Sequence, residues 1–420
     1  MGMAPASTPE AIPGASPAPR HPLLLPHFRN LWLGSTLSLL GDQFYLVALP
    51  WLVLHLTGSS LALGTMLMAA AIPRAALMLV GGVVTDRVSP RRVLIMTAAT
   101  RAVFVGTMAV LLWLKIVELW QLYLLTLGFG VADAFSFPAG AALIPSLVPP
   151  QQLQPANALL QSSSMLTQMA GPAPAGLAIK RWGIAPALLF DALSFLAVLA
   201  ALLKIPSPPR VPHAAPGAPT QRSMLHSIGE GLRAVRNDPP LLSLMAIFAI
   251  FNFCVAGPIG VGLAAVAKFH FGSAAAFGIL LSCFSGGTLA GSLLSGLVKR
   301  PRQRGLQFIA MGALTGLELL AIGVVLKLVA IGTLLVLMGL GVGFVNVQFS
   351  VWIQIRVDPA LLGRVMSVLM MFAIGLVPVS YAVSGVLAQG SPKWLFIAAG
   401  TVLVASSAMT LASRAAREIA

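Results

Sequence analysis

The sequence contains few charged residues. Only 9% of its 420 residues are charged and 58% are hydrophobic, whereas a soluble domain has about 25% charged and about 45–50% apolar residues. Such a chain cannot hide its apolar surface from water, which excludes a soluble protein. Acidic residues are especially scarce, with eleven against 26 basic ones. The basic residues lie in short clusters between apolar runs, so membrane topology explains them better than a nucleic-acid partner.

Cysteine and histidine are also scarce. The two cysteines, Cys254 and Cys283, lie inside apolar runs, where we expect small core side chains and no disulfide. No histidine falls at the centre of an apolar run, and His55 and His270 lie at run boundaries. Because no Cys or His pair has the spacing of metal ligands, we expect no metal site, no cofactor and no catalysis.

Apolar runs, by contrast, are abundant. Runs of roughly 20 residues, enough to span about 30 Å of hydrocarbon, recur with short breaks and predict an all-α membrane protein with twelve transmembrane helices. We place these helices at 31–56, 61–84, 93–115, 119–147, 156–179, 186–204, 241–267, 273–298, 305–327, 329–355, 362–388 and 394–413.

The breaks divide the chain into two halves. Residues 1–26 are proline-rich and lack a continuous apolar core, which predicts a disordered tail rather than a secretory signal. The longest break, 205–240, predicts a linker between six-helix bundles at 27–204 and 241–413, and residues 414–420 form a short tail. A shift of 214 residues aligns the two halves, so that Gly64 meets Gly278 and Gly82 meets Gly296. This repeat predicts two parallel-related bundles with a substrate site between them near the midplane.

Basic residues predict the orientation. Eighteen of the 26 Lys and Arg residues fall on the side of the N-terminus and six on the other side, while Arg74 and Arg101 fall within helices. The positive-inside rule therefore places both termini and the 205–240 linker in the cytoplasm.

The break after the second span carries a motif. It has the order Gly82-x-x-x-Asp86-Arg87-x-x-x-Arg91-Arg92, which resembles the loop signature of the major facilitator superfamily, the twelve-helix secondary transporters. The resemblance implies that Asp86 contacts the start of the helix at 362–388, where Arg364 lies in the first turns. Such a contact would act as a latch that stabilises the outward-open state, since an anion at a helix N-terminus is stabilised by free N–H groups.

Other stretches resemble one branch of that family. Pro138-Ala139, Ala156-Asn157-Ala158, Gly171-Pro172 with Gly176, and Gly363-Arg364 look like the bacterial branch of macrolide-efflux and enterobactin-exporter-like proteins. The match departs from drug/proton antiporters in two respects. The helix at 119–147 has Asp133 but no arginine, and Thr167 and Ala158 stand where the antiporter motif has glycines.

Four charges inside the predicted helices carry the functional hypothesis, because each costs at least about 2.5–3.5 kcal/mol at a helix centre unless it is paired or hydrated. Asp42 and Arg74 lie at similar depth, so we expect them to pair, either as a fixed structural pair or as one that opens when Asp42 takes a proton or meets a cationic substrate. Asp133 has Arg101 as a possible partner. The resemblance implies that the helix of Asp133 lines the cavity, which favours Asp133 as the proton carrier. Asp191 and Glu318 are expected to be structural.

Uncharged polar residues predict the cavity lining. Each one is also explained by interhelical hydrogen bonding, but together with seventeen methionines and twenty phenylalanines they suit an adaptable apolar cavity with a few polar groups. The candidates are Gln43, Tyr45, Gln161, Ser164, Gln168, Asn252, Asn346 and Gln348.

These observations predict a proton-coupled exporter of small amphipathic organic molecules in a bacterial inner membrane, acting as a monomer among membrane lipids. A phosphate-binding loop is absent, so a gradient rather than nucleotide hydrolysis would supply the energy. Movement of lipid or lysophospholipid is the alternative substrate class. A non-transporting membrane receptor or channel is the alternative of a different kind.

Overall fold

The computed structural model describes residues 21–206, 229, 232–297 and 304–412. Within these residues every regular element is a helix. The first half contains a short 3-10 helix, Pro22–Leu24, followed by α1 (Pro26–Thr57), α2 (Ser60–Arg87), α3 (Pro90–Trp113), α4 (Leu119–Leu143), α5 (Leu153–Ala170), α6 (Pro172–Trp182) and α7 (Ile184–Leu203). Two further 3-10 turns, Ile144–Ser146 and Pro150–Gln152, connect α4 to α5.

The second half begins with α9 (Pro239–Gly257), which continues without a break through a π-helical turn (Pro258–Gly262), α10 (Leu263–Val266) and a second π-helical turn (Ala267–Phe271). It is followed by α11 (Ala274–Leu297), α12 (Arg304–Val324), α13 (Leu328–Arg356), α14 (Pro359–Gly375), α15 (Val377–Leu387) and α16 (Pro392–Ala412).

Each of the twelve expected spans coincides with one of these helices or with consecutive helical elements. Eleven helical segments are long and apolar enough to cross a membrane. The remaining expected span, 156–179, is the pair α5 and α6, which is interrupted at Gly171-Pro172. Pro172 has no N–H to donate, so it begins a new helix rather than continuing the old one. The all-α membrane fold is therefore confirmed.

Local sequence signals explain where several helices begin and end. Gly58 takes the left-handed conformation with φ of 62° and ends α1, and the Ser59 hydroxyl accepts a hydrogen bond from Ala62 N to start α2. Asp238 begins α9 in the same way, accepting from Leu241 N. Its carboxylate also binds Arg356 at the end of α13, and this hydrogen bond holds the pKa of Asp238 below its ordinary value.

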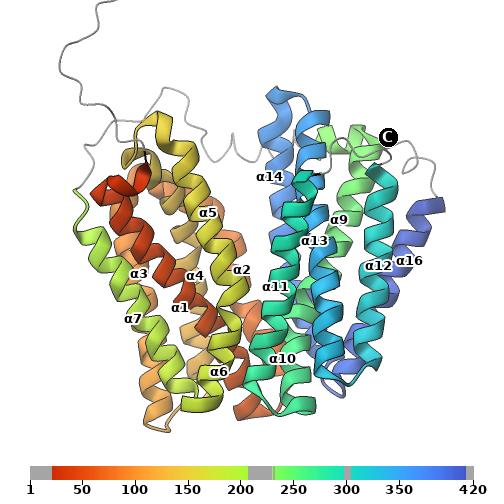
Figure 1. Ribbon diagram of the computed structural model, residues 1–420, viewed down its shortest axis with the longest axis horizontal. Coiled ribbons are helices and arrows are strands. Elements are labelled where there is room, and N and C mark those ends of the chain that lie inside the picture. Colours follow the sequence, from red (N-terminus) through yellow and green to blue (C-terminus); the bar gives the residue numbers. More distant parts are fainter. Residues whose placement is uncertain (1–20, 207–228, 230–231, 298–303, 413–420) are drawn as a thin grey trace, which may run out of the picture.

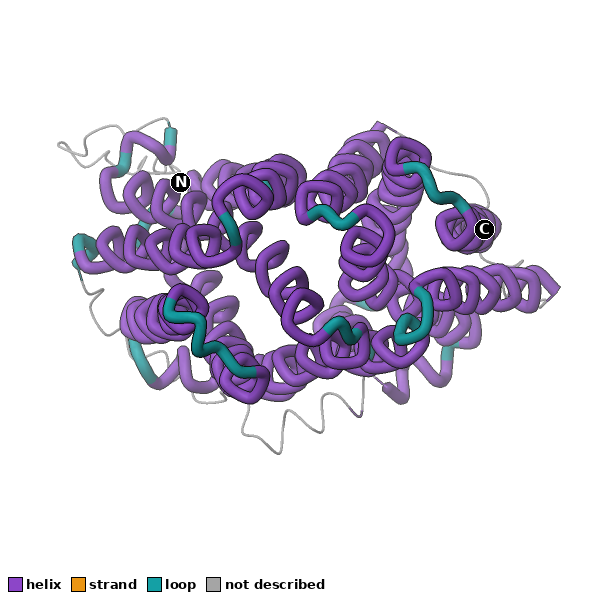
Figure 2. The backbone as a smooth tube through the Cα atoms, turned by 90° about the horizontal axis from the view of Figure 1, so that it is seen from below, coloured by secondary structure: helices purple, strands orange, loops and turns teal. Residues whose placement is uncertain are grey.

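The two halves form two bundles side by side (Figures 1 and 2). Their ribbons lie close together on the lower side of Figure 1 and apart on the upper side, where α1 begins and α16 ends. Buried apolar side chains of both halves, such as Trp51, Leu63, Phe277 and Phe396, join in one core. Large apolar side chains also cover the outside, for example Trp113, Leu297 and Met409, as expected of lipid-facing surface.

The close contact between the bundles depends on glycines, which have no side chain. A Cβ at Gly64 on α2 would overlap the carbonyl of Tyr381 on α15 and lie 2.7 Å from Gly385 Cα. Likewise, a Cβ at Gly278 on α11 would overlap the carbonyl of Pro172, and one at Gly176 on α6 would overlap the carbonyl of Ala274. Gly64 and Gly278 occupy equivalent positions in the 214-residue repeat. Each half therefore uses a glycine at this position to let its helix approach the other half closely on the lower side.

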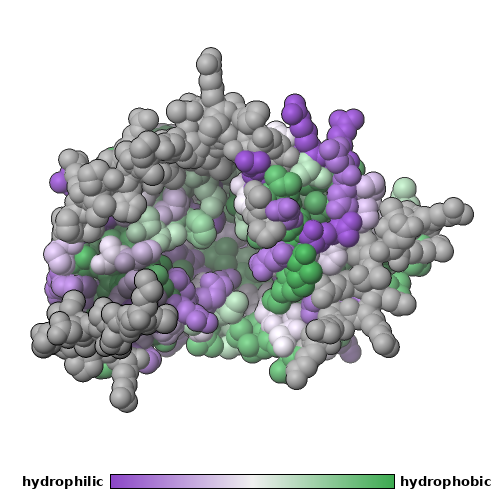
Figure 3. Space-filling view, turned by 90° about the horizontal axis from the view of Figure 1, so that it is seen from above, coloured by the Kyte–Doolittle hydropathy of each residue, from purple (hydrophilic) through white to green (hydrophobic). Residues whose placement is uncertain are grey.

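Seen from the upper side, the surface is hollowed between the bundles (Figure 3). The protein is therefore closed between its halves on the lower side and open on the side that carries the beginning of α1.

Candidate functional site: charges inside the N-terminal bundle

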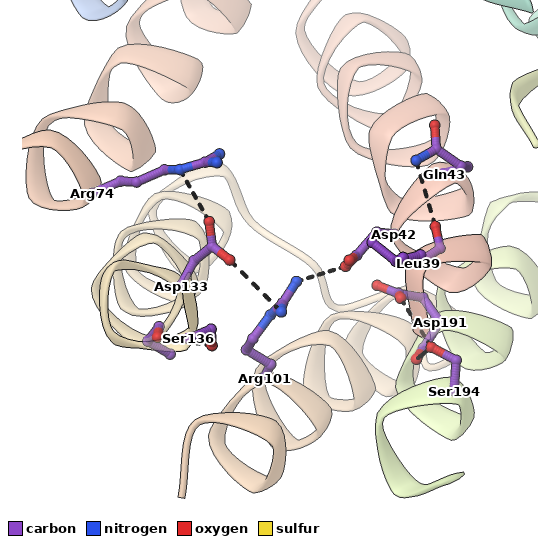
Figure 4. A network of polar contacts seen from close by, with 10 residues as sticks. Leu39, Asp42, Gln43, Arg74, Arg101, Asp133, Ser136, Asp191 and Ser194 are labelled. Carbon is purple, nitrogen blue, oxygen red and sulfur yellow. Dashed lines mark hydrogen bonds and ion pairs between the residues drawn. The ribbon is translucent and has the colours of Figure 1, made fainter. Parts of the chain in front are cut away.

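Four charged residues from four helices meet inside the N-terminal bundle (Figure 4). Arg101 Nη2 on α3 binds Asp42 Oδ1 on α1 at 2.6 Å, and Arg101 Nη1 lies 3.7 Å from Asp133 Oδ1 on α4. Arg74 Nε on α2 binds Asp133 Oδ2 at 3.1 Å. The order Asp42, Arg101, Asp133, Arg74 thus forms a chain of alternating charge, which we call the charge cluster.

Arg101 is the best-enclosed member. Its side chain is 12% exposed, and its guanidinium carbon lies 4.5 Å from the Phe129 ring centre and 4.3 Å from the Phe195 ring centre. Both rings stabilise the cation through their electron-rich faces. The Nε of Arg101 has no hydrogen-bond partner. Arg74, the last member of the charge cluster, has the most exposed side chain of the four, at 62%.

Among the described residues the expected Asp42–Arg74 pair does not form, whereas Arg101, the possible partner of Asp133, does lie close to it, 3.7 Å away. The expectation of an Asp42–Arg74 pair compared the two residues only by their depth along their helices. In the structure α2 packs along α4, helped by Gly130, where a Cβ would overlap the carbonyl of Ala70. Arg74 therefore faces Asp133, while Arg101, on α3, is left to bind Asp42. The partners follow from helix neighbours and rotation, which depth does not encode.

The structure places two of the predicted lining residues together. Gln161 and Gln168 on α5 line a cavity of about 190 Å³ with Ser285, Thr288 and Ser292 of α11, and Met165 and Phe284 supply its apolar surface. Gln168 Nε2 donates to Ser164 Oγ at 3.0 Å. This cavity lies between the two halves of the chain, where the repeat predicts a substrate site.

The other lining candidates are dispersed. Gln43 is 7% exposed and packs on Gly171, and the Tyr45 ring stacks on Phe129 at 4.5 Å. Asn252 donates to its own helix at Phe248 O, and Gln348 is buried and donates weakly to Ser295 O at 3.4 Å. Asn346 is exposed on α13.

The predicted gating loop is described only in part. The surroundings of Gly82 and the side chains of Asp86 and Arg87 lie outside what the structure describes, so the latch stays a prediction. Arg91 donates to the carbonyls of Leu202 and Leu203, which it caps at the end of α7. Arg92 is exposed, and Arg364 is half-buried on α14.

One further charged residue, for which the sequence predicts only a structural role, lies beside the charge cluster. Asp191 on α7 is fully buried close to Asp42, and Ser194 Oγ is 3.4 Å from its Oδ1 (Figure 4). The small residues Gly41 and Ser194, which make room for a carboxyl between α1 and α7, were the available signal, but they gain meaning only once those helices are known to be neighbours.

Relatives with this overall length are known. The chain is 24% identical over 386 residues to macrolide efflux protein A of Streptococcus pyogenes, covering 90% of this chain and 93% of the relative. It is 26% identical over 309 residues to the enterobactin exporter EntS of Shigella boydii, covering 71% and 72% of the two chains.

Solved structures share the fold. A bacterial homologue of the iron transporter ferroportin, in an inward-facing state, has a TM-score of 0.69 at 18% identity and covers 93% of this chain and 100% of its own. The nucleoside transporter NupG has a TM-score of 0.70 at 16% identity, covering 92% and 98%.

The model of the Major Facilitator Superfamily matches residues 31–379. Because this match spans most of the chain and the two-bundle fold agrees with it, the protein belongs to the major facilitator superfamily of membrane transporters and is not an enzyme.

Proposed function

We propose that this protein is a secondary transporter that couples proton movement to the efflux of small amphipathic organic molecules across a bacterial inner membrane. The observation that carries the proposal is the charge cluster. Such charges are expensive inside a membrane and mark proton or substrate pathways in transporters. The efflux direction is supported by the names of two similar proteins, a macrolide efflux protein and an enterobactin exporter.

The charge cluster offers a mechanism for coupling. Asp133 lies between Arg74 and Arg101 and is 21% exposed, so its carboxylate is not sealed off from its surroundings. A proton on Asp133 removes the charge that holds both guanidinium groups. Arg101 then depends on Asp42 alone, and Arg74 is released. A cationic substrate at the same carboxylate would compete with the proton, which is the exchange that an antiporter needs.

The cavity between α5 and α11 supports an amphipathic substrate. Met165 and Phe284 provide apolar contact, while Gln161, Gln168 and Ser285 provide a few hydrogen-bonding groups. A sugar would need more polar groups than this wall offers, and a metal ion would need more anionic ones.

Alternating access would expose this site to one side of the membrane and then to the other. With the termini in the cytoplasm, the side open in Figure 3 is the cytoplasmic one, and the state described is inward-open. The Asp86 latch would then engage in the opposite state, where the cytoplasmic ends of α2 and α14 meet. We expect the protein to work as a monomer among lipids, because each chain contains both halves of the site.

Proteoliposomes test the coupling. With ethidium as probe, the wild type should transport in response to a pH gradient, and Asp133→Asn should lose this transport while keeping exchange of ethidium without a gradient. Ser136→Ala, three residues further along α4, is the matched control and should behave like the wild type. If Asp133→Asn keeps full pH-driven transport while Asp42→Asn loses it, the proton site is on α1.

Substrate class is tested in the same vesicles. Macrolides, siderophores and lysophospholipids should be compared as competitors of ethidium, and competition by lysophospholipid alone would favour a lipid transporter. Saturable counterflow is expected of a carrier, and its absence together with passive flux would point to a channel.

A further inference from the structure

A third carboxyl lies behind the charge cluster. Asp191 has no exposed surface, and its Oδ2 has no hydrogen-bond partner. The Ser194 hydroxyl donates mainly to the Asp191 backbone oxygen at 2.7 Å and is 3.4 Å from Oδ1. Among the described residues, no Lys or Arg forms an ion pair with it. A carboxylate without a cation in this environment is strongly disfavoured relative to the neutral acid.

The carboxyl of Asp191 is placed against Asp42 by a glycine. A Cβ at Gly41 would lie 2.7 Å from Asp191 Oδ1, so the missing side chain lets the carboxyl pack on the backbone of α1 one residue from Asp42. The ionisable groups that face Asp191 are Asp42 and Tyr45 from α1 and Arg101 from α3. Figure 4 shows the carboxyls of Asp42 and Asp191 on the same side of Arg101.

The balance of acidic and basic groups in this region indicates which carboxyl carries a proton. Asp42, Asp133 and Asp191 supply three carboxyls to this region, and Arg74 and Arg101 supply two guanidinium groups. The region is neutral when it holds one proton. Asp42 and Asp133 each bind an arginine, so the proton belongs on Asp191, the carboxyl that lacks one.

We propose that Asp191 is a second proton-binding carboxyl of the coupling site, which holds its proton away from water behind Asp42 and exchanges it through Asp42. In the exchange the O–H bond of Asp191 breaks and an O–H bond forms on the Asp42 carboxylate, while Arg101 turns from Asp42 to the new anion at Asp191. The net charge of the region does not change. Asp42, at 27% exposed, then passes the proton to the open side. This inference rests on the proposed proton coupling.

Infrared difference spectroscopy tests the proton on Asp191 without transport. A neutral buried carboxylic acid gives a carbonyl band distinct from that of a carboxylate, and the purified protein near neutral pH should show this band. Asp191→Asn, which is isosteric and permanently neutral, should lose it. Glu318→Gln is the matched control, because Glu318 is the buried carboxyl of α12, is 5% exposed and lies outside the coupling site. It should lose a separate band and keep pH-driven transport.

Transport measurements then distinguish a functional role of Asp191 from a purely structural one. A purely structural neutral acid would be replaced by Asn without effect, so full pH-driven ethidium transport in Asp191→Asn would overturn the proposal. An unchanged infrared band in that variant would also overturn it. Loss of both the band and the pH-driven transport, with exchange retained, is the expected result. If the wild type itself shows no pH-driven transport, the proposed proton coupling fails, whereas the infrared result still reports whether Asp191 holds a proton.

Discussion

Arg101 organises the interior of the N-terminal bundle. It binds Asp42 at 2.6 Å, lies near Asp133 and packs against two phenylalanine rings. Arg74 shares one of the same carboxylates but is 62% exposed. The two arginines therefore differ in their contribution to stability, because a carboxylate left without its cation costs more free energy when the pair is buried than when it is exposed.

Arg101→Ala should destabilise the protein far more than Arg74→Ala. Removing Arg101 leaves Asp42 without a cation, and breaking a buried pair costs about 3–5 kcal/mol. Removing Arg74 breaks an exposed pair, worth up to about 1 kcal/mol. Thermal unfolding of both variants in one detergent checks the difference. Equal losses of stability would show that Arg101 is not the central cation.

Helix contacts explain how the two halves close on the lower side. Gly64 and Gly278 occupy equivalent positions of the repeat, and each allows its helix to touch the backbone of the opposite half. Since backbone cannot move aside as a flexible side chain can, these positions tolerate no added atoms in the closed state.

Gly64→Leu and Gly278→Leu should each shift the protein away from the state described. Overpacking costs about 1–3 kcal/mol, and ~1.4 kcal/mol changes a two-state ratio tenfold. Spin labels at Ile116 and Val329, exposed positions near the lower ends of α3 and α13, should report longer distances. Gly140→Leu is the control, because nothing lies within 4 Å of a Cβ there. Distances unchanged from wild type in both variants would contradict the role of these glycines.

For the whole molecule, the charge count predicts which side faces the cytoplasm. In a background without Cys254 and Cys283, Ser223→Cys, in the linker outside the described residues, should resist an impermeant thiol reagent applied to intact cells. Ile116→Cys, 54% exposed in the loop between α3 and α4 before substitution, should react. The reverse pattern would invert the topology and make the open side extracellular.

The sequence by itself determined the class of protein, the twelve spans and the repeat. These properties follow from the local cost of placing polar backbone and charge in hydrocarbon, which depends on composition along the chain. Asp42, Arg74, Arg101 and Asp133 were identified for the same reason, since each stands out within an apolar run.

Only the tertiary structure decided how those residues combine. Helical rotation and the choice of neighbours brought Arg101 to Asp42 and Arg74 to Asp133, and they placed Asp191 behind Gly41. An ion pair depends on two side chains within about 4 Å, and residues 59 positions apart, such as Asp42 and Arg101, reach that distance only through packing between helices. That packing is set by small residues on separate helices acting together, which no single stretch of sequence reveals.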